Sequence, residues 1–240
     1  MVINIKSTLN KKQLLIIEYF SLYIILPSIY VIFNLDSWFK LMFQGKWLLL
    51  YQMHKIILLQ IMFIYTLFIY SLKIRNYNYF KFSNLINNIS YIKNIFKRLL
   101  IITIILLIFT YFVFPNHLFE TFKLYNIKIL LLVFFFYPLL SVIQQEFIYR
   151  IFFYERYKEF FPKIKELVIS NSLVFMFVHI IYENWFSLFT TFIGNFLFIS
   201  TFIRTKSFYF ILIEHSLYGL IIFYIGLGNF FYKTHTLKIF

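Results

Sequence analysis

The sequence has no cysteine among its 240 residues, and it has only 5 glycines and 4 prolines. Without cysteine the chain has no disulfide framework, no thiolate nucleophile, no cysteine-based metal site and no cysteine to carry a lipid. No Gly- or Pro-rich linker, internal repeat or low-complexity tail divides it. We therefore expect one domain over residues 1–240.

Acidic residues are also scarce, with 9 Asp and Glu against 23 Lys and Arg, which gives a formal net charge of +14. Such a charge can indicate nucleic-acid binding, but that function needs a solvated basic face. Here the basic residues lie in the connections between apolar runs, where membrane topology accounts for them. We expect no nucleic-acid partner, and a lipid bilayer as the surroundings.

Apolar residues make up 62% of the chain, with 36 Phe and a mean hydropathy of +0.80. So much apolar surface cannot be buried inside a soluble domain of this length. The predicted fold is an all-α, polytopic transmembrane helix bundle of about seven (six to eight) spans, each near the ~20 residues that a membrane crossing requires. The predicted spans are residues 13–34, 56–72, 99–114, 128–154, 167–184, 187–203 and 207–226. Residues 1–127 would hold the N-terminal helices and a basic cytoplasmic loop, and residues 128–226 the motif-bearing core.

Lys and Arg are concentrated in alternate connections of the chain. The connections 1–12, 73–98, 155–166 and 204–206 carry three, six, four and two of them. Because cytoplasmic loops hold the excess of basic residues, the N-terminus is predicted to be cytoplasmic and the C-terminus external. The first span lacks a small-residue cleavage site, which favours a retained signal anchor. The basic connection 73–98 resembles an interfacial amphipathic helix, with a re-entrant segment as the alternative.

Four of the ionisable residues inside predicted spans are the most informative: Glu146, Arg150, His179 and His215. An ionisable group in hydrocarbon is costly unless it is paired or lines a wet cavity, so each marks a candidate functional site. From the predicted span ends, Glu146 and His215 lie ~12 Å deep and His179 ~18 Å deep, at 1.5 Å per residue. We expect three helices to form a cavity in the cytoplasmic half of the membrane.

The local spacings give these residues neighbours. Glu146 and Arg150 are four apart and therefore share a helical face, either as part of a site or as a neutralising pair that locks helices together. Phe175 lies one turn before His179, and an isolated histidine in a membrane is usually a hydrogen-bonding helix contact.

The last span carries a second carboxylate and a glycine beside its histidine. Gly219 follows His215 by one turn and lets another helix or a substrate approach closely. Glu214 adjoins His215, but adjacent residues point about 100° apart on a helix, so both need not face the cavity.

Taken in order, these motifs resemble the intramembrane endopeptidases of the CAAX-protease and bacteriocin-processing (Abi) family. The matching patterns are Gln145-Glu146-xxx-Arg150, Phe175-xxx-His179 and His215-xxx-Gly219, within residues 130–230. The resemblance implies cleavage of a peptide bond near the cytoplasmic membrane face. It implies Glu146 and His179 as acid and base and His215 as transition-state stabiliser. The supporting positions would be Gln145, Arg150, Phe175, Glu214 and Gly219.

The sequence departs from the family pattern at two of these positions. Gln145 replaces the first glutamate, so Glu146 or Glu214 supplies the carboxylate, or His179 activates water, or hydrolysis is lost. Gly219 replaces an asparagine, which removes an oxyanion donor of a kind worth about 2.7–4 kcal/mol in tested enzymes.

We expect no cofactor. Zn²⁺ is the alternative, with His179, His215 and Glu146 as its ligands, because imidazole and carboxylate groups suit this ion. The sequence, however, lacks the His-Glu-xx-His spacing that puts two ligands on one helix. A metal-free mechanism is therefore favoured.

Two other functions remain open on the same fold. One is a noncatalytic protein that binds a peptide or a partner membrane protein, as in bacteriocin immunity. The other is acyl transfer to a lipoprotein amine in place of water. The expected partner is thus a peptide, lipoprotein or membrane-protein substrate. The abundance of Phe, Ile, Lys and Asn is typical of an AT-rich bacterial genome. Together with the apolar spans, it favours a multi-pass protein of a bacterial cell membrane.

Overall fold

The computed structural model describes residues 10–231, and these residues form helices and turns without a strand. Seven of the helical stretches are long and apolar enough to cross a membrane: Lys11–Ile32, Met53–Lys73, Tyr91–Val113, Ile127–Phe160, Ile164–Tyr182, Trp185–Thr205 and Phe208–Ile225. The predicted all-α, polytopic bundle is confirmed, and the protein is a multi-pass membrane protein.

The first three spans and their connections contain α1 (Lys11–Phe20), α2 (Leu26–Ile32), α3 (Leu35–Met42), α4 (Leu48–Lys73), α5 (Phe82–Asn87) and α6 (Tyr91–Val113). The rest of the bundle contains α7 (Glu120–Leu124), α8 (Ile127–Tyr137), α9 (Ile143–Glu146), α10 (Phe153–Tyr157), α11 (Ile164–Val178), α12 (Trp185–Thr205) and α13 (Phe208–Ile225). Short 3₁₀ and π-helical turns join several of them.

Asparagine side chains begin several of these helices. Asn10, Asn126 and Asn184 each accept a hydrogen bond from the backbone N–H three residues further on, at the starts of α1, α8 and α12. Such caps satisfy N–H groups that the helix itself leaves unpaired. At the other end of the chain, α13 stops at Gly226, whose φ of 111° lies in the left-handed region that favours glycine.

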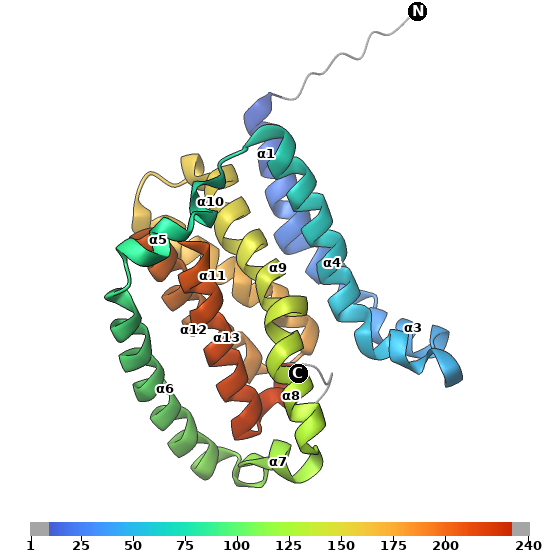
Figure 1. Ribbon diagram of the computed structural model, residues 1–240. Helices are drawn as coiled ribbons and strands as arrows, with labels where there is room; N and C mark the ends of the chain where they lie inside the picture. The colour runs from blue at the N-terminus through green and yellow to red at the C-terminus, as the bar shows by residue number, and fades with distance from the viewer. Residues whose placement is uncertain (1–9, 232–240) are drawn as a thin grey trace, which may run out of the picture.

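The last helix, α13, has a central place in the bundle, beside α6, α8, α9 and α12 (Figure 1). Helices α1, α5 and α10 lie towards one end of the molecule, and α3 and α7 lie at the other (Figure 1). The basic connections 73–98 and 155–166, which contain or adjoin α5 and α10, therefore lie at the same end. This agrees with an alternating path of the spans across a membrane.

Large apolar side chains cover much of the outer surface. Ile32 and Phe112 are each 75% exposed, whereas Phe152 and Phe202 in the core are fully buried. In water such an exposed apolar surface would be a liability, but in a bilayer it is the surface that meets lipid. The core is therefore the part of the bundle that packs around α13 and the fourth span.

The connection between the second and third spans is shorter than predicted. Helix α6 begins at Tyr91, so three basic residues of the predicted loop, Lys93, Lys97 and Arg98, lie on its first turns. Lys93 and Lys97 are exposed, and such long basic side chains can keep the apolar stem on the helix while the charge reaches the membrane edge, whereas Arg98 pairs with the buried Glu214 of α13. Neither α3 nor α7 was predicted, because short helices of about one or two turns leave little trace in hydropathy.

The fourth span is long and irregular, and it ends at Phe160, beyond the predicted residue 154. Two π-helical segments interrupt it, Pro138–Val142 and Phe147–Phe152. Proline has no backbone N–H to donate, and π-helical turns are often found at functional sites. Asn171 of α11 donates a hydrogen bond to the carbonyl of Tyr149 within the second segment, which ties the irregular backbone to a neighbouring helix.

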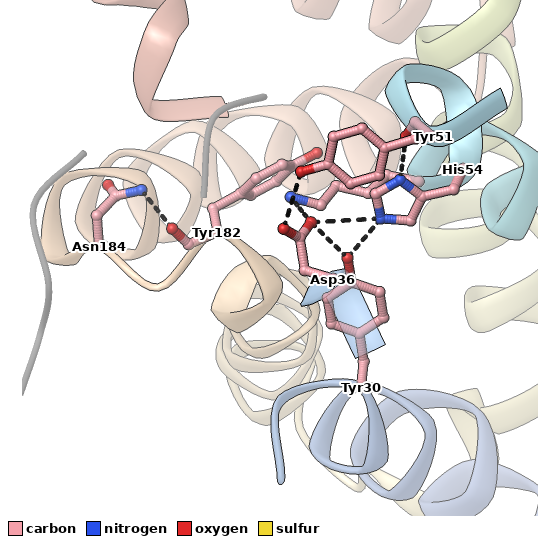
Figure 2. Close-up of polar contacts among 7 residues, drawn as sticks. Tyr30, Asp36, Tyr51, His54, Tyr182 and Asn184 are labelled. Carbon is pink, nitrogen blue, oxygen red and sulfur yellow. Dashed lines mark hydrogen bonds and ion pairs between the residues drawn. The ribbon is translucent and has the colours of Figure 1, made fainter. Parts of the chain in front are cut away.

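A buried polar cluster joins the second span to the preceding helices (Figure 2). The Asp36 carboxylate accepts hydrogen bonds from the Tyr30 and Tyr51 hydroxyls at 3.1 Å each. His54 Nε2 lies 3.5 Å and Lys55 Nζ 3.3 Å from the same carboxylate. We call Tyr30, Asp36, Tyr51, His54 and Lys55 the Asp36 cluster. It fixes α2, α3 and α4 to one another.

Candidate active site

The centre of the site is the Glu146 carboxylate at the end of α9, which is completely buried. Its Oε1 lies 2.5 Å from Nδ1 of His215 on α13. Its Oε2 forms an ion pair with Nε of Arg150 at 2.9 Å. The structure thus brings together the charged residues of the fourth span and the histidine of the seventh. Both carboxylate oxygens are engaged by nitrogen atoms of this chain.

The guanidinium of Arg150 is held by this ion pair and by aromatic rings. Its Cζ lies 4.5 Å from the centroid of the Phe175 ring and 5.3 Å from that of Phe198. Cations are attracted to the faces of aromatic rings, most strongly when water is excluded. Phe198 was not predicted from the sequence, since nothing in the local pattern distinguishes it from the many other Phe residues.

His179 stands at the end of α11, where the helix passes into a 3₁₀ turn. Its Nδ1 lies 2.6 Å from the backbone oxygen of Phe175. Because a carbonyl oxygen only accepts hydrogen bonds, Nδ1 is the protonated nitrogen, and Nε2 carries the lone pair. This backbone contact fixes an imidazole that can accept a proton.

The ring of Phe175 lies between the two histidines. Its centroid is 4.7 Å from that of His179 and 6.0 Å from that of His215. The His215 imidazole also stacks on the Phe198 ring, with 4.6 Å between the two centroids. Phe175 therefore contacts both imidazoles and the guanidinium. The polar groups are enclosed by aromatic rings, which lowers the local dielectric constant and strengthens each charge interaction.

The two other candidates, the carboxamide of Gln145 and the carboxylate of Glu214, have different partners from Glu146. The Gln145 amide donates to the Ser141 hydroxyl at 2.8 Å, one turn back on the same span. Glu214 is buried, and its Oε1 forms an ion pair with Arg98 Nη2 on α6 at 2.8 Å. The carboxylate beside the histidines is that of Glu146.

Gly219 lies one turn after His215, against a residue that no sequence motif marks. A Cβ atom built on Gly219 would lie only 2.0 Å from the hydroxyl oxygen of Tyr137. The phenol of Tyr137 therefore occupies the space in which a side chain at 219 would lie. No sequence signal predicts this contact, because Tyr137 and Gly219 lie far apart in the chain.

The donor atoms do not make an obvious metal centre. Among residues 10–231, no group of three or more His, Asp or Glu side chains is arranged to hold a metal ion. Within the alternative ligand set of Glu146, His179 and His215, Glu146 contacts His215 and also pairs with Arg150. What the arrangement offers is an imidazole with a free nitrogen and a second imidazole paired with a buried carboxylate. Such groups can move protons and stabilise negative charge.

Comparison with known proteins supports the resemblance. The model of the family described as type II CAAX prenyl endopeptidase Rce1-like matches residues 126–221, which include all the motif residues above. Comparison with curated proteins and with solved structures gave no significant match. Over residues 126–221, the motif-bearing region of this membrane protein is therefore similar to the Rce1-like family of CAAX-type proteases.

Proposed function

We propose that this protein is an intramembrane endopeptidase that hydrolyses a peptide bond of a peptide, lipoprotein or membrane protein. The observation that carries the proposal is the meeting of Glu146, Arg150 and His215 from two spans, beside the fixed imidazole of His179. The match to a protease family over the same residues supports it.

In this mechanism His179 is the general base. Its Nε2 removes a proton from water while the water oxygen bonds to the peptide carbonyl carbon, and the carbonyl oxygen becomes an oxyanion. When the tetrahedral intermediate collapses, the C–N bond breaks and the proton on His179 passes to the leaving nitrogen. Water has then added across the amide bond, giving a carboxyl group and an amine. The backbone bond of Nδ1 to Phe175 keeps Nε2 available for both proton transfers.

His215 stabilises the oxyanion in this scheme. In the scheme His215 acts as an imidazolium, whose Nδ1–H donates to the Glu146 carboxylate and whose Nε2–H donates to the oxyanion. Glu146 does not act as a free base, because its two oxygens are occupied by His215 and Arg150. Its function is to hold the charge and orientation of His215. This assigns water activation to His179, one of the alternatives that the loss of the first glutamate leaves open.

The test compares the N-termini of membrane proteins and the masses of lipopeptides in cells that carry the wild-type chain or His179→Ala at matched expression. The comparison works without choosing a substrate beforehand, because every membrane protein of the cell is surveyed. We expect cleavage ends that are present with the wild type and absent with the variant. Glu18→Gln is the matched control, because Glu18 is also a glutamate paired with an arginine, Arg156, but at another place in the bundle. Its cells should retain the wild-type ends.

The other outcomes separate the competing functions. A change in acyl mass without new protein ends would indicate acyl transfer. No difference in either measurement would contradict an enzymatic role and leave binding of a peptide or partner as the better explanation.

A further inference from the structure

The replacement of the last-motif asparagine by Gly219 removes a donor from the site, and the structure shows what fills the space. A Cβ at position 219 would lie 2.0 Å from Oη of Tyr137 and 2.5 Å from the Cε1 and Cζ atoms of its ring. Non-bonded atoms do not approach so closely, so the phenol occupies the volume in which any side chain at 219 would begin. Tyr137 and Gly219 are thus sterically complementary, because a side chain at 219 would displace the phenol from this position.

This phenol lies beside the proposed catalytic histidine. The Tyr137 ring meets the His215 imidazole edge to face, with 6.4 Å between the centroids. Glu146 and Tyr182 are close enough to the Tyr137 hydroxyl to interact with it electrostatically. Tyr137 comes from the last turn of α8, just before the π-helical segment that begins at Pro138. The irregular fourth span therefore supplies both Glu146, from α9, and the hydroxyl of Tyr137, from the end of α8.

We propose that Tyr137 is a catalytic residue whose hydroxyl donates the second hydrogen bond to the oxyanion, in the place left open by Gly219. The proposal rests on the hydrolytic function proposed above. His215 and Tyr137 would then approach the developing negative charge together, one as imidazolium and the other as a neutral phenol. A phenol O–H is a good donor to an oxyanion, and enzymes use tyrosine in this way. The amide of a membrane-associated substrate is the group that this pair would bind.

A packing role alone predicts a different behaviour on mutation. Tyr137→Phe keeps the ring that packs against Gly219 and His215 and removes only the hydroxyl. If Tyr137 only fills space, this variant keeps wild-type activity. If the hydroxyl stabilises the transition state, kcat falls while KM does not change, because the interaction forms only as the oxyanion develops.

The experiment measures kcat and KM with a synthetic peptide that spans a cleavage site found in the comparison of N-termini. We expect Tyr137→Phe to lower kcat by about 10²–10³-fold with unchanged KM. Tyr218→Phe is the matched control. Its hydroxyl is also buried, on α13 next to Gly219, but it interacts with Glu214 and Arg98. This variant should keep the wild-type kcat.

A residue exchange tests the steric argument. Gly219→Asn alone should reduce activity, because its Cβ collides with Tyr137, and Tyr137→Ala alone should reduce it through loss of the donor. The double variant Tyr137→Ala/Gly219→Asn restores an amide donor in the vacated space, and its kcat should exceed that of either single variant. If both single variants fold but the double variant recovers no activity, the Tyr137 hydroxyl and the amide introduced by Gly219→Asn do not serve as donors from the same place.

The outcomes distinguish this inference from the function on which it depends. His179-dependent cleavage combined with a wild-type kcat for Tyr137→Phe would overturn the role of Tyr137 and leave the endopeptidase in place. Absence of any His179-dependent cleavage would overturn both. Thermal unfolding in detergent, performed on every variant, identifies loss of activity that comes from loss of the fold.

Discussion

At the scale of single residues, the unusual feature is a charged pair without exposure to solvent. The side chains of Glu146 and Arg150 are both completely buried. Removing two charges from water is costly, and their mutual attraction balances this cost only while both are present. The rings of Phe175 and Phe198 beside the guanidinium add a further favourable interaction. The pair therefore holds the fold together only as a unit.

Glu146→Gln should consequently destabilise the protein as well as inactivate it. The variant leaves the Arg150 guanidinium as an uncompensated buried charge, which typically costs about 3–5 kcal/mol. Thermal unfolding in detergent measures the loss of stability. The double variant Glu146→Gln/Arg150→Met has no unpaired buried guanidinium, so most of the lost free energy of unfolding should return while cleavage stays absent. A double variant no more stable than the single one would contradict this account of the pair.

At the scale of elements, polar contacts connect helices that apolar packing alone would leave free to slide. Arg98 of α6 pairs with Glu214 of α13 and also donates to Thr201 of α12 at 3.0 Å. Asn195 of α12 donates to Asn171 of α11 at 2.9 Å. In lipid there is little hydrophobic force between helices, so such bonds and close packing decide their register.

The contact between Arg98 and Glu214 leads to a prediction about Glu214. From the sequence, Glu214 was an alternative to Glu146 as the carboxylate that takes part in hydrolysis. Glu214→Gln removes a charge-assisted contact between α6 and α13 and should cost about 1.5–3 kcal/mol of stability. Cleavage per folded molecule should be unchanged, because Glu214 faces Arg98 and not the two histidines. The activity is measured together with the folded fraction. A folded but inactive variant would place Glu214 in the mechanism.

The Asp36 cluster predicts a response to alkaline pH. Burial and the neighbouring Asp36 carboxylate both raise the pKa of Tyr51 above its ordinary value near 10. As the pH rises, Tyr51 therefore ionises at a lower pH in the unfolded protein than in the folded protein. Its contribution to the free energy of unfolding is complete below about pH 10 and is lost as the pH rises towards the higher folded-state pKa. Unfolding temperatures measured from pH 8 to 11 should therefore fall more steeply for the wild type than for Tyr51→Phe. Parallel curves for the two proteins would contradict a protonated Tyr51 donor (Figure 2).

At the scale of the whole molecule, charge and hydropathy define a path across the membrane. The basic connections 73–98 and 155–166 and the helices α1, α5 and α10 lie together at one end of the bundle (Figure 1). The orientation with the N-terminus in the cytoplasm remains a prediction from the distribution of Lys and Arg.

The lack of cysteine makes this orientation easy to test, since any introduced cysteine is unique in the chain. Ser90 precedes α6 and is exposed, and Asn116 is exposed in the connection after the same helix. A membrane-impermeant maleimide added to intact cells should label Asn116→Cys and leave Ser90→Cys unlabelled until the cells are opened. The reverse pattern would invert the topology.

The class of the protein, its seven spans and its three motif-bearing helices could all be predicted from the sequence. These properties are local: a run of apolar residues long enough to cross a bilayer forms a helix because every backbone polar group must be paired within it. The rarity of ionisable residues in such runs marked Glu146, Arg150, His179 and His215 directly.

The partners of these residues, in contrast, follow from tertiary packing alone. Whether Glu146 or Glu214 meets the histidines depends on the rotation of α13 about its own axis, which is set by packing against α6, α9 and α12. The contact of Tyr137 with Gly219 likewise joins two spans, so no local pattern contains it. A hydropathy profile gives the length and place of a helix, but the direction of each side chain is set by the helices that surround it.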